Sequence, residues 1–184
     1  SCQPLSMNFT LLNAYMLQTI TPWPTHGDAA HHHALFNDPT FRAAFKRSLA
    51  TPVTGGRIFN GTWQYMEVNQ SPTQAALEGR TIDEIAHERG IDPVDALLDI
   101  GLADDLKTTF VVRLLNVDEG RVGDLISEDG NLVSRSDAGA HLTPFCDAGY
   151  AMHLLGRWVR ELGSFSLPYA IRKVPGDSAH VYGS

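Results

Sequence analysis

The sequence contains little cysteine, no long apolar run and no cluster of basic residues. Only Cys2 and Cys146 occur among 184 residues, without a CxxC or other zinc-ligand spacing, which excludes a disulfide framework and fits a cytoplasmic protein. The formal net charge is -7 and Lys and Arg form no run, so we expect no nucleic-acid partner. The longest apolar stretches, such as residues 96–102, are far shorter than the roughly 20 residues of a membrane span, so we expect no membrane partner.

The composition predicts one domain or a part of one. With 43% hydrophobic residues, the chain can bury one sizeable core. Its 184 residues are too few for two ordinary domains. The sequence opens on Ser1-Cys2-Gln3-Pro4, with no basic or apolar signal region. We therefore expect no secretion signal and interpret the sequence as a fragment of a longer chain.

The first 80 residues combine a strand end, a long loop and a helical insertion. Residues 1–23 are apolar and rich in Thr and Asn, which predicts a strand running into a loop. Asp38 followed by Pro39 gives an N-cap and a proline at the first helical position, so a helix is predicted over residues 39–49. The aromatic and β-branched stretch 57–68, with Asn60-Gly61 inside it, predicts a short hairpin.

A helical pair and an alternation of strands and helices follow. Thr81 and Glu84 form a capping box for a helix that should end at Gly90, and Asp92-Pro93 begins a second one. The nearly continuous apolar run 108–115 predicts a parallel strand buried on both faces. We expect a helix over residues 117–126, a second parallel strand over 131–136, and a helix over 151–162 in which Trp158 belongs to the core.

The residues most suited to chemistry follow the second of these strands. Asp137 lies where the strand should end, in a loop of small residues, and His141 adds a group that titrates near neutral pH. In α/β barrels the reacting groups sit at that end of the strands. Aspartate in such a loop is also ordinary turn chemistry. From composition alone we favour the interpretation that Asp137 caps a turn.

Several sequence blocks resemble the D-aminoacylase-like (N-acyl-D-amino-acid deacylase) family of metal-dependent amidohydrolases. The blocks occur in the family's order at residues 136–141, 154–161, 166–173 and 179–183, after a similar helical pair at 79–86 and 90–99. The resemblance covers residues 81–183 well. It is looser in residues 1–57, where Cys2-Gln3-Pro4-Leu5 looks like the end of an earlier barrel strand.

The resemblance implies an α/β fold, the C-terminal part of a (β/α)8 TIM-type amidohydrolase barrel, helix-rich with a few parallel strands. Residues 1–184 would form one partial barrel domain, divided into 1–80 and the final helices and strands, 81–184. It also implies that zinc activates a water molecule and that Asp137 takes the proton and passes it to the leaving nitrogen. The expected substrate is a small N-acyl-D-amino acid with a linear amide bond.

The family's metal ligands are missing from this sequence. The His-x-His pair and the cysteine ligand of the family belong to earlier strands, so we expect zinc in the longer protein and neither zinc nor activity in this fragment alone. The run His31-His32-His33, with His26 nearby, lacks ligand spacing, and we interpret it as a solvated loop. Cys146 is interpreted as a small buried hydrophobe.

Three further points stay open. His141 has two interpretations of equal weight. In the first it has a functional role, either orienting Asp137 or contacting a substrate carboxylate. In the second it only forms a hydrogen bond with the loop backbone. The alternatives to the deacylase are a cyclic amidohydrolase of the dihydroorotase or hydantoinase kind, separable by a cysteine or modified-lysine metal ligand, and a non-catalytic binding module, separable by zinc content. Unpaired sheet edges in such a fragment favour pairing with a second copy, so a homo-oligomer is expected.

Overall fold

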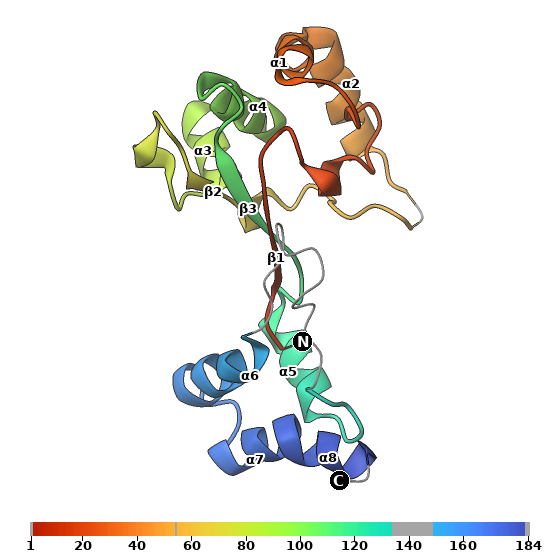
Figure 1. The fold of residues 1–184 in the computed structure, drawn as a ribbon, viewed down its shortest axis with the longest axis vertical. Helices are drawn as coiled ribbons and strands as arrows, with labels where there is room; N and C mark the ends of the chain where they lie inside the picture. The colour runs from red at the N-terminus through yellow and green to blue at the C-terminus, as the bar shows by residue number, and fades with distance from the viewer. Residues whose placement is uncertain (1, 54, 134–148, 183–184) are drawn as a thin grey trace. The chain divides into compact units, whose positions relative to one another are not determined.

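The computed structural model describes residues 2–53, 55–133 and 149–182. The chain divides into two compact units. Met7–Val112 is called the N-terminal unit, and Ser1–Ser6 with Arg113–Ser184 is called the C-terminal unit. Each is described by itself, with the labels of Figure 1.

Two strands, β1 (Leu5–Phe9) and β3 (Thr109–Leu115), continue across the boundaries between the units. Between them the N-terminal unit contains η1 (Tyr15–Leu17), α1 (Ala29–Asn37), α2 (Pro39–Ala50), η2 (Trp63–Tyr65), β2 (Met66–Gln70), η3 (Ala75–Leu77), α3 (Ile82–Arg89) and α4 (Pro93–Ala103). The C-terminal unit contains α5 (Glu119–Ser127), α6 (Tyr150–His153), the π-helical η4 (Leu154–Glu161), α7 (Leu167–Ile171), the π-helical η5 (Arg172–Gly176) and α8 (Asp177–Tyr182).

Aspartate caps define the first two helices of the N-terminal unit. The Asp28 carboxylate accepts a hydrogen bond from the His31 amide at 2.8 Å and begins α1. Asp38 ends α1 and caps α2, which confirms the helix predicted over residues 39–49. The loop predicted for the histidine run is wrong. The cap at Asp28 starts a helix there, and it was overlooked in the sequence.

The helical pair confirms its predicted caps. The Thr81 hydroxyl accepts from the Glu84 amide at 3.2 Å, and Glu84 Oε2 accepts from the Thr81 amide at 3.0 Å. Gly90 ends α3 in the left-handed conformation, and Asp92 caps α4. On α4, a Cβ added to Gly101 would lie 2.3 Å from Leu11 Cδ1, so only glycine permits this close approach.

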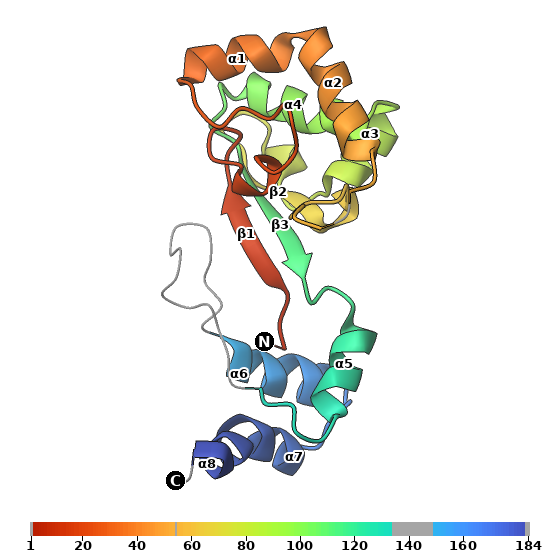
Figure 2. The same ribbon diagram turned by 90° about the vertical axis from the view of Figure 1, so that its right-hand side faces the viewer.

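The sheet corrects the predicted fold class. It has three strands in the order β1-β3-β2, and β2 pairs with β3 antiparallel, with Met66 opposite Val112 and Val68 opposite Phe110. Figure 2 shows the arrows of β1 and β3 pointing in opposite directions. The predicted parallel strands and (β/α)8 barrel are therefore wrong. Of the second strand expected over 131–136, residues 131–133 form no strand and 134–136 lie outside the described residues.

The error came from the direction assigned to β3. Phe110 and Val112 are fully buried while Val111 and Arg113 are half-buried, so its apolar run does not require two equally buried faces. An apolar run also carries no information on the direction of the neighbouring strand. That information lay in β2, where Met-Glu-Val-Asn alternates as antiparallel strands do. The hairpin predicted around Asn60-Gly61 is wrong, because β2 pairs with β3 instead.

The C-terminal unit packs around Trp158, as predicted. Its buried core consists of Cys2, Val122, Ile126, Val133, Leu154, Trp158 and Ala170. A Cβ on Gly123 would lie 3.0 Å from the Trp158 ring, so α5 and η4 pack closely at this glycine. Among the helices in the described part of the chain, none is long and apolar enough to cross a membrane.

Candidate functional site

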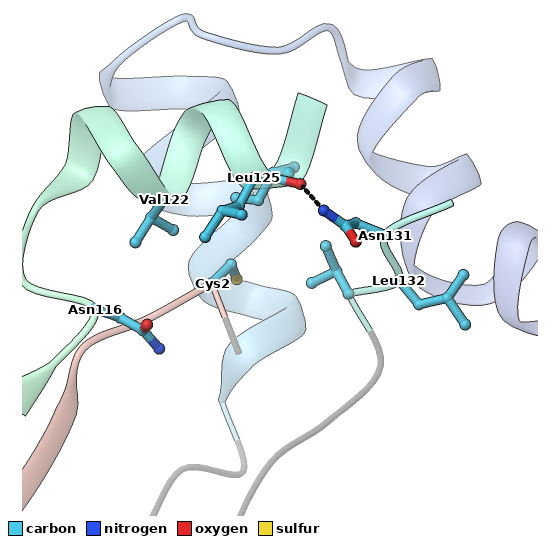
Figure 3. A pocket seen from close by; sticks show the side chains of 8 residues that line it. Cys2, Asn116, Val122, Leu125, Asn131 and Leu132 are labelled. Carbon is cyan, nitrogen blue, oxygen red and sulfur yellow. Dashed lines mark hydrogen bonds between the residues drawn. The ribbon is translucent and has the colours of Figure 1, made fainter. Parts of the chain in front are cut away.

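A pocket of about 300 Å³ lies within the C-terminal unit and is called the α5 pocket. The apolar side chains of Val122, Leu125 and Ile126 form its α5 wall. Residues 131–133 form another wall, and Cys2 and Asn116 complete the described lining. Figure 3 shows Cys2 between the α5 side chains and the segment that carries Asn131 and Leu132. The volume is at the lower end of the range for small-molecule pockets.

Cys2 is held in place by hydrogen bonds to the helical region that follows residue 149. Its thiol donates to the Tyr150 carbonyl oxygen at 3.0 Å, and its own carbonyl oxygen accepts from Trp158 Nε1 at 3.0 Å. Burial raises the pKa of the Cys2 thiol above its ordinary value, so the sulfur is a neutral part of the pocket. Cys2 is a poor nucleophile in this state.

Asn131 is fixed by bonds to α5 and to the turn after it. Its amide nitrogen donates to the Leu125 carbonyl oxygen at 3.0 Å and to Glu128 Oε2 at 2.9 Å. The main-chain carbonyl oxygen of Asn131 accepts a hydrogen bond from Lys173 Nζ at 3.1 Å. The main-chain carbonyl oxygen of Glu128 accepts one from the same ammonium group at 3.0 Å. Lys173 is 1% exposed. The turn before residues 131–133 is therefore tied to η5 by a buried ammonium group.

The predicted site residues Asp137 and His141, like Cys146, lie outside the described residues. Their predicted roles stay predictions. The described lining of the α5 pocket ends at Val133, which precedes them directly in the sequence. This is the part of the structure nearest in sequence to the predicted catalytic loop.

Two histidines of α1 take part in hydrogen bonds with residues of the same helix and its cap. His32 is 3% exposed, and its Nδ1 donates to the Asp28 carbonyl oxygen at 2.8 Å. His33 is exposed and lies 3.3 Å from the Asn37 amide nitrogen. Within the described ranges, no group of three or more His, Cys, Asp or Glu side chains is placed to hold a metal ion.

A buried carboxylate in the N-terminal unit, Asp104, joins several elements of that unit through hydrogen bonds. Asp104 is 4% exposed and accepts hydrogen bonds from the hydroxyl groups of Ser71, Thr73 and Thr108. Burial raises the pKa of Asp104, but these hydrogen bonds outweigh it and keep the pKa below its ordinary value. Because its partners are donors from the unit's own loops, the group joins β2, α4 and β3.

The residues that line the α5 pocket were missed in the sequence. Cys2 and Val133 are far apart in the chain, and no local pattern indicates that they meet. One weak signal existed in the sequence: an asparagine, Asn116, directly follows the apolar strand β3. In the structure Asn116 adopts a left-handed conformation with φ 57°, which asparagine tolerates.

Comparison with known proteins adds no activity. No family model matches the chain, and no solved structure matches it. The chain is 24% identical over 163 residues to an uncharacterized protein of Mycobacterium bovis and, to the same extent, to uncharacterized proteins of two Mycobacterium tuberculosis strains. The alignments cover 85% of this chain and 26% of each relative, so it spans about a quarter of their length. The family resemblance stays a prediction.

Proposed function

We propose that the protein containing this chain hydrolyses a linear amide C–N bond, with N-acyl-D-amino acids as its substrates. The supporting observation is the succession of sequence blocks in the order of the D-aminoacylase-like family, with Asp137 in the block at residues 136–141. Since the chain spans about a quarter of the length of its curated relatives, the activity is proposed for the whole protein.

In the proposed mechanism Asp137 transfers one proton in two steps. Its carboxylate accepts the proton of the attacking water as the new C–O bond forms, and then delivers that proton to the amide nitrogen as the C–N bond breaks. In this family zinc activates the water. The described residues offer no ligand cluster for zinc, so no step is assigned to the metal.

The α5 pocket supports an acylated substrate. Apart from Cys2, whose thiol is neutral, the described lining carries no ionisable side chain. Such a surface stabilises an apolar group and leaves a charged one without compensation. The carboxylate of the substrate would therefore be bound elsewhere in the protein.

The test replaces Asp137 by Asn in the full-length protein. We expect turnover to fall at least about a hundredfold while folding and zinc content are unchanged, because only the proton transfer is removed. Asp129→Asn is the matched control, since Asp129 is an exposed carboxylate in the same unit. Turnover near that of the unmodified protein in Asp137→Asn would remove Asp137 from the mechanism.

The substrate class is tested with a panel of N-acetyl-D-leucine, N-acetyl-L-leucine and a hydantoin. We expect hydrolysis of the first in preference to the other two. Preferential opening of the hydantoin ring would support a cyclic amidohydrolase instead. Absence of hydrolysis and of zinc from the full-length protein would contradict the proposed function.

A further inference from the structure

The α5 pocket has an apolar wall on α5, and its described lining comes from one unit. Val122 is 6% exposed and Val133 is 5% exposed, so their side chains belong equally to the core and to the pocket wall. Leu125 is 54% exposed and stands where the same wall reaches the surface. A ligand that extends an aliphatic chain past Leu125 toward Val122 would remove apolar surface from water on both sides.

The lining of the pocket also has polar groups held by hydrogen bonds, among them the side-chain amide of Asn131. Both donors of the Asn131 amide are used, one by the Leu125 carbonyl oxygen and one by Glu128 Oε2. The side-chain oxygen of Asn131 can act only as an acceptor. Figure 3 shows the bond from the Asn131 nitrogen to the Leu125 carbonyl oxygen as a dashed line. A ligand that meets this oxygen must present an N–H or O–H group.

An N-acyl amide joins an aliphatic chain to an N–H donor through its carbonyl carbon. We propose that the α5 pocket binds the acyl chain of an N-acyl substrate, with the amide N–H donating to the Asn131 side-chain oxygen. This inference rests on the proposed function for the identity of the substrate. It adds that the protein prefers acyl chains longer than acetyl, because the pocket of about 300 Å³ exceeds what an acetyl group fills.

Binding is measured first, without any reaction. The probe is N-methylhexanamide, titrated into the full-length protein by ligand-observed NMR, with N-methylacetamide and N,N-dimethylhexanamide as comparisons. Each additional buried methylene should tighten binding about fourfold, up to the capacity of the pocket. Loss of the N–H in the dimethyl compound should weaken binding about fivefold, because the Asn131 oxygen then lacks its donor.

Variants locate the binding. Leu125→Phe fills the mouth of the pocket and, since Leu125 is largely exposed, leaves the fold intact; we expect at least about tenfold weaker binding of N-methylhexanamide. Met152→Phe is the matched control, because Met152 is 72% exposed in the same unit and does not line the pocket. Equal weakening in both variants, or none in Leu125→Phe, would overturn the proposal.

The catalytic readout separates this inference from the proposed function. If both hold, kcat/KM should rise from N-acetyl- to N-hexanoyl-D-leucine, and Leu125→Phe should abolish that rise. Probe binding without hydrolysis would contradict the proposed function and support the pocket. Hydrolysis with no dependence on chain length and no saturable probe binding would support the function and overturn the pocket.

Discussion

The two units differ in how their helices are fixed. In the N-terminal unit α1, α2, α3 and α4 each begin at a side chain that accepts a backbone amide hydrogen bond, and Asp104 joins strands and helix through buried hydrogen bonds. In the C-terminal unit Asp118 and Ser166 cap α5 and α7 in the same way, but α6 has no such cap, and η4 and η5 are π-helical. The α5 pocket belongs to this second unit.

From this difference we infer that the N-terminal unit contributes mainly to stability and the C-terminal unit mainly to binding. Fully capped helices and satisfied buried groups raise local stability, whereas binding regions are commonly drawn from less stable segments. π-Helical turns are rare and occur mostly near functional sites. We therefore expect mutations in the N-terminal unit to lower stability most, and mutations in the C-terminal unit to alter binding more than stability.

The largest stability effect is expected for Asp104→Asn. The substitution removes the negative charge to which three hydroxyl groups donate hydrogen bonds. It also places the amide NH2 group of asparagine against one of these donors. The free energy of unfolding should therefore fall by about 2–3 kcal/mol. Urea denaturation at pH 7 measures it. Asp105→Asn is the control, because the Asp105 side chain is exposed. Asparagine also tolerates the backbone φ of 54° at this position. A fall of equal size in both would contradict a special role for Asp104.

The pH dependence of Asp104 follows from its lowered pKa. A carboxyl whose pKa is lower in the folded than in the unfolded state contributes stability that is present above its unfolded pKa, about 3.9, and lost as the pH falls through the folded value. The unmodified chain should lose this contribution below about pH 4. In Asp104→Asn that loss should be absent.

A matched pair of glycines tests how tightly the helices pack. Gly101→Ala should lower the free energy of unfolding by about 1–2 kcal/mol, because the new methyl group meets the buried Leu11 side chain and outweighs the gain in helix propensity. Gly156→Ala in η4 meets no atom within 4 Å and should raise it by about 0.5–1 kcal/mol. Both are measured by thermal and urea unfolding. Stabilisation by both substitutions would remove the packing contrast.

Local features of this fold could be predicted from the sequence, and non-local ones could not. The capping box at Thr81, the cap at Asp92 and the stop at Gly90 depend on residues within a few positions of one another, and all are confirmed. The partner of β3 depends on residues some forty positions away, and the predicted parallel barrel was wrong. The α5 pocket joins Cys2 to Val133, for which the sequence holds no local signal.

A further prediction concerns the buried lysine of the C-terminal unit. Lys173→Met leaves the carbonyl oxygens of Glu128 and Asn131 without their donor, so the free energy of unfolding should fall by about 1 kcal/mol. Binding of N-methylhexanamide should weaken as well, because the turn that carries Asn131 loses its anchor. Arg172→Met, at a largely exposed neighbour, is the control for both measurements. Full binding in Lys173→Met would show that the pocket does not need this anchor.

The smallest expected effect is the pH response of His153. Burial lowers the pKa of this imidazole, and the nearby Arg157 guanidinium lowers it further against the opposing carboxylates of Glu119 and Glu161. A histidine whose folded pKa is below its unfolded value of about 6.5 takes up its proton more readily when unfolded, so stability should fall as the pH decreases from about 7 to 5. The imidazole is only partly buried, so the change should stay below about 1 kcal/mol. His153→Gln should flatten this slope. A slope unaffected by His153→Gln would show that another group causes the loss of stability between about pH 7 and 5.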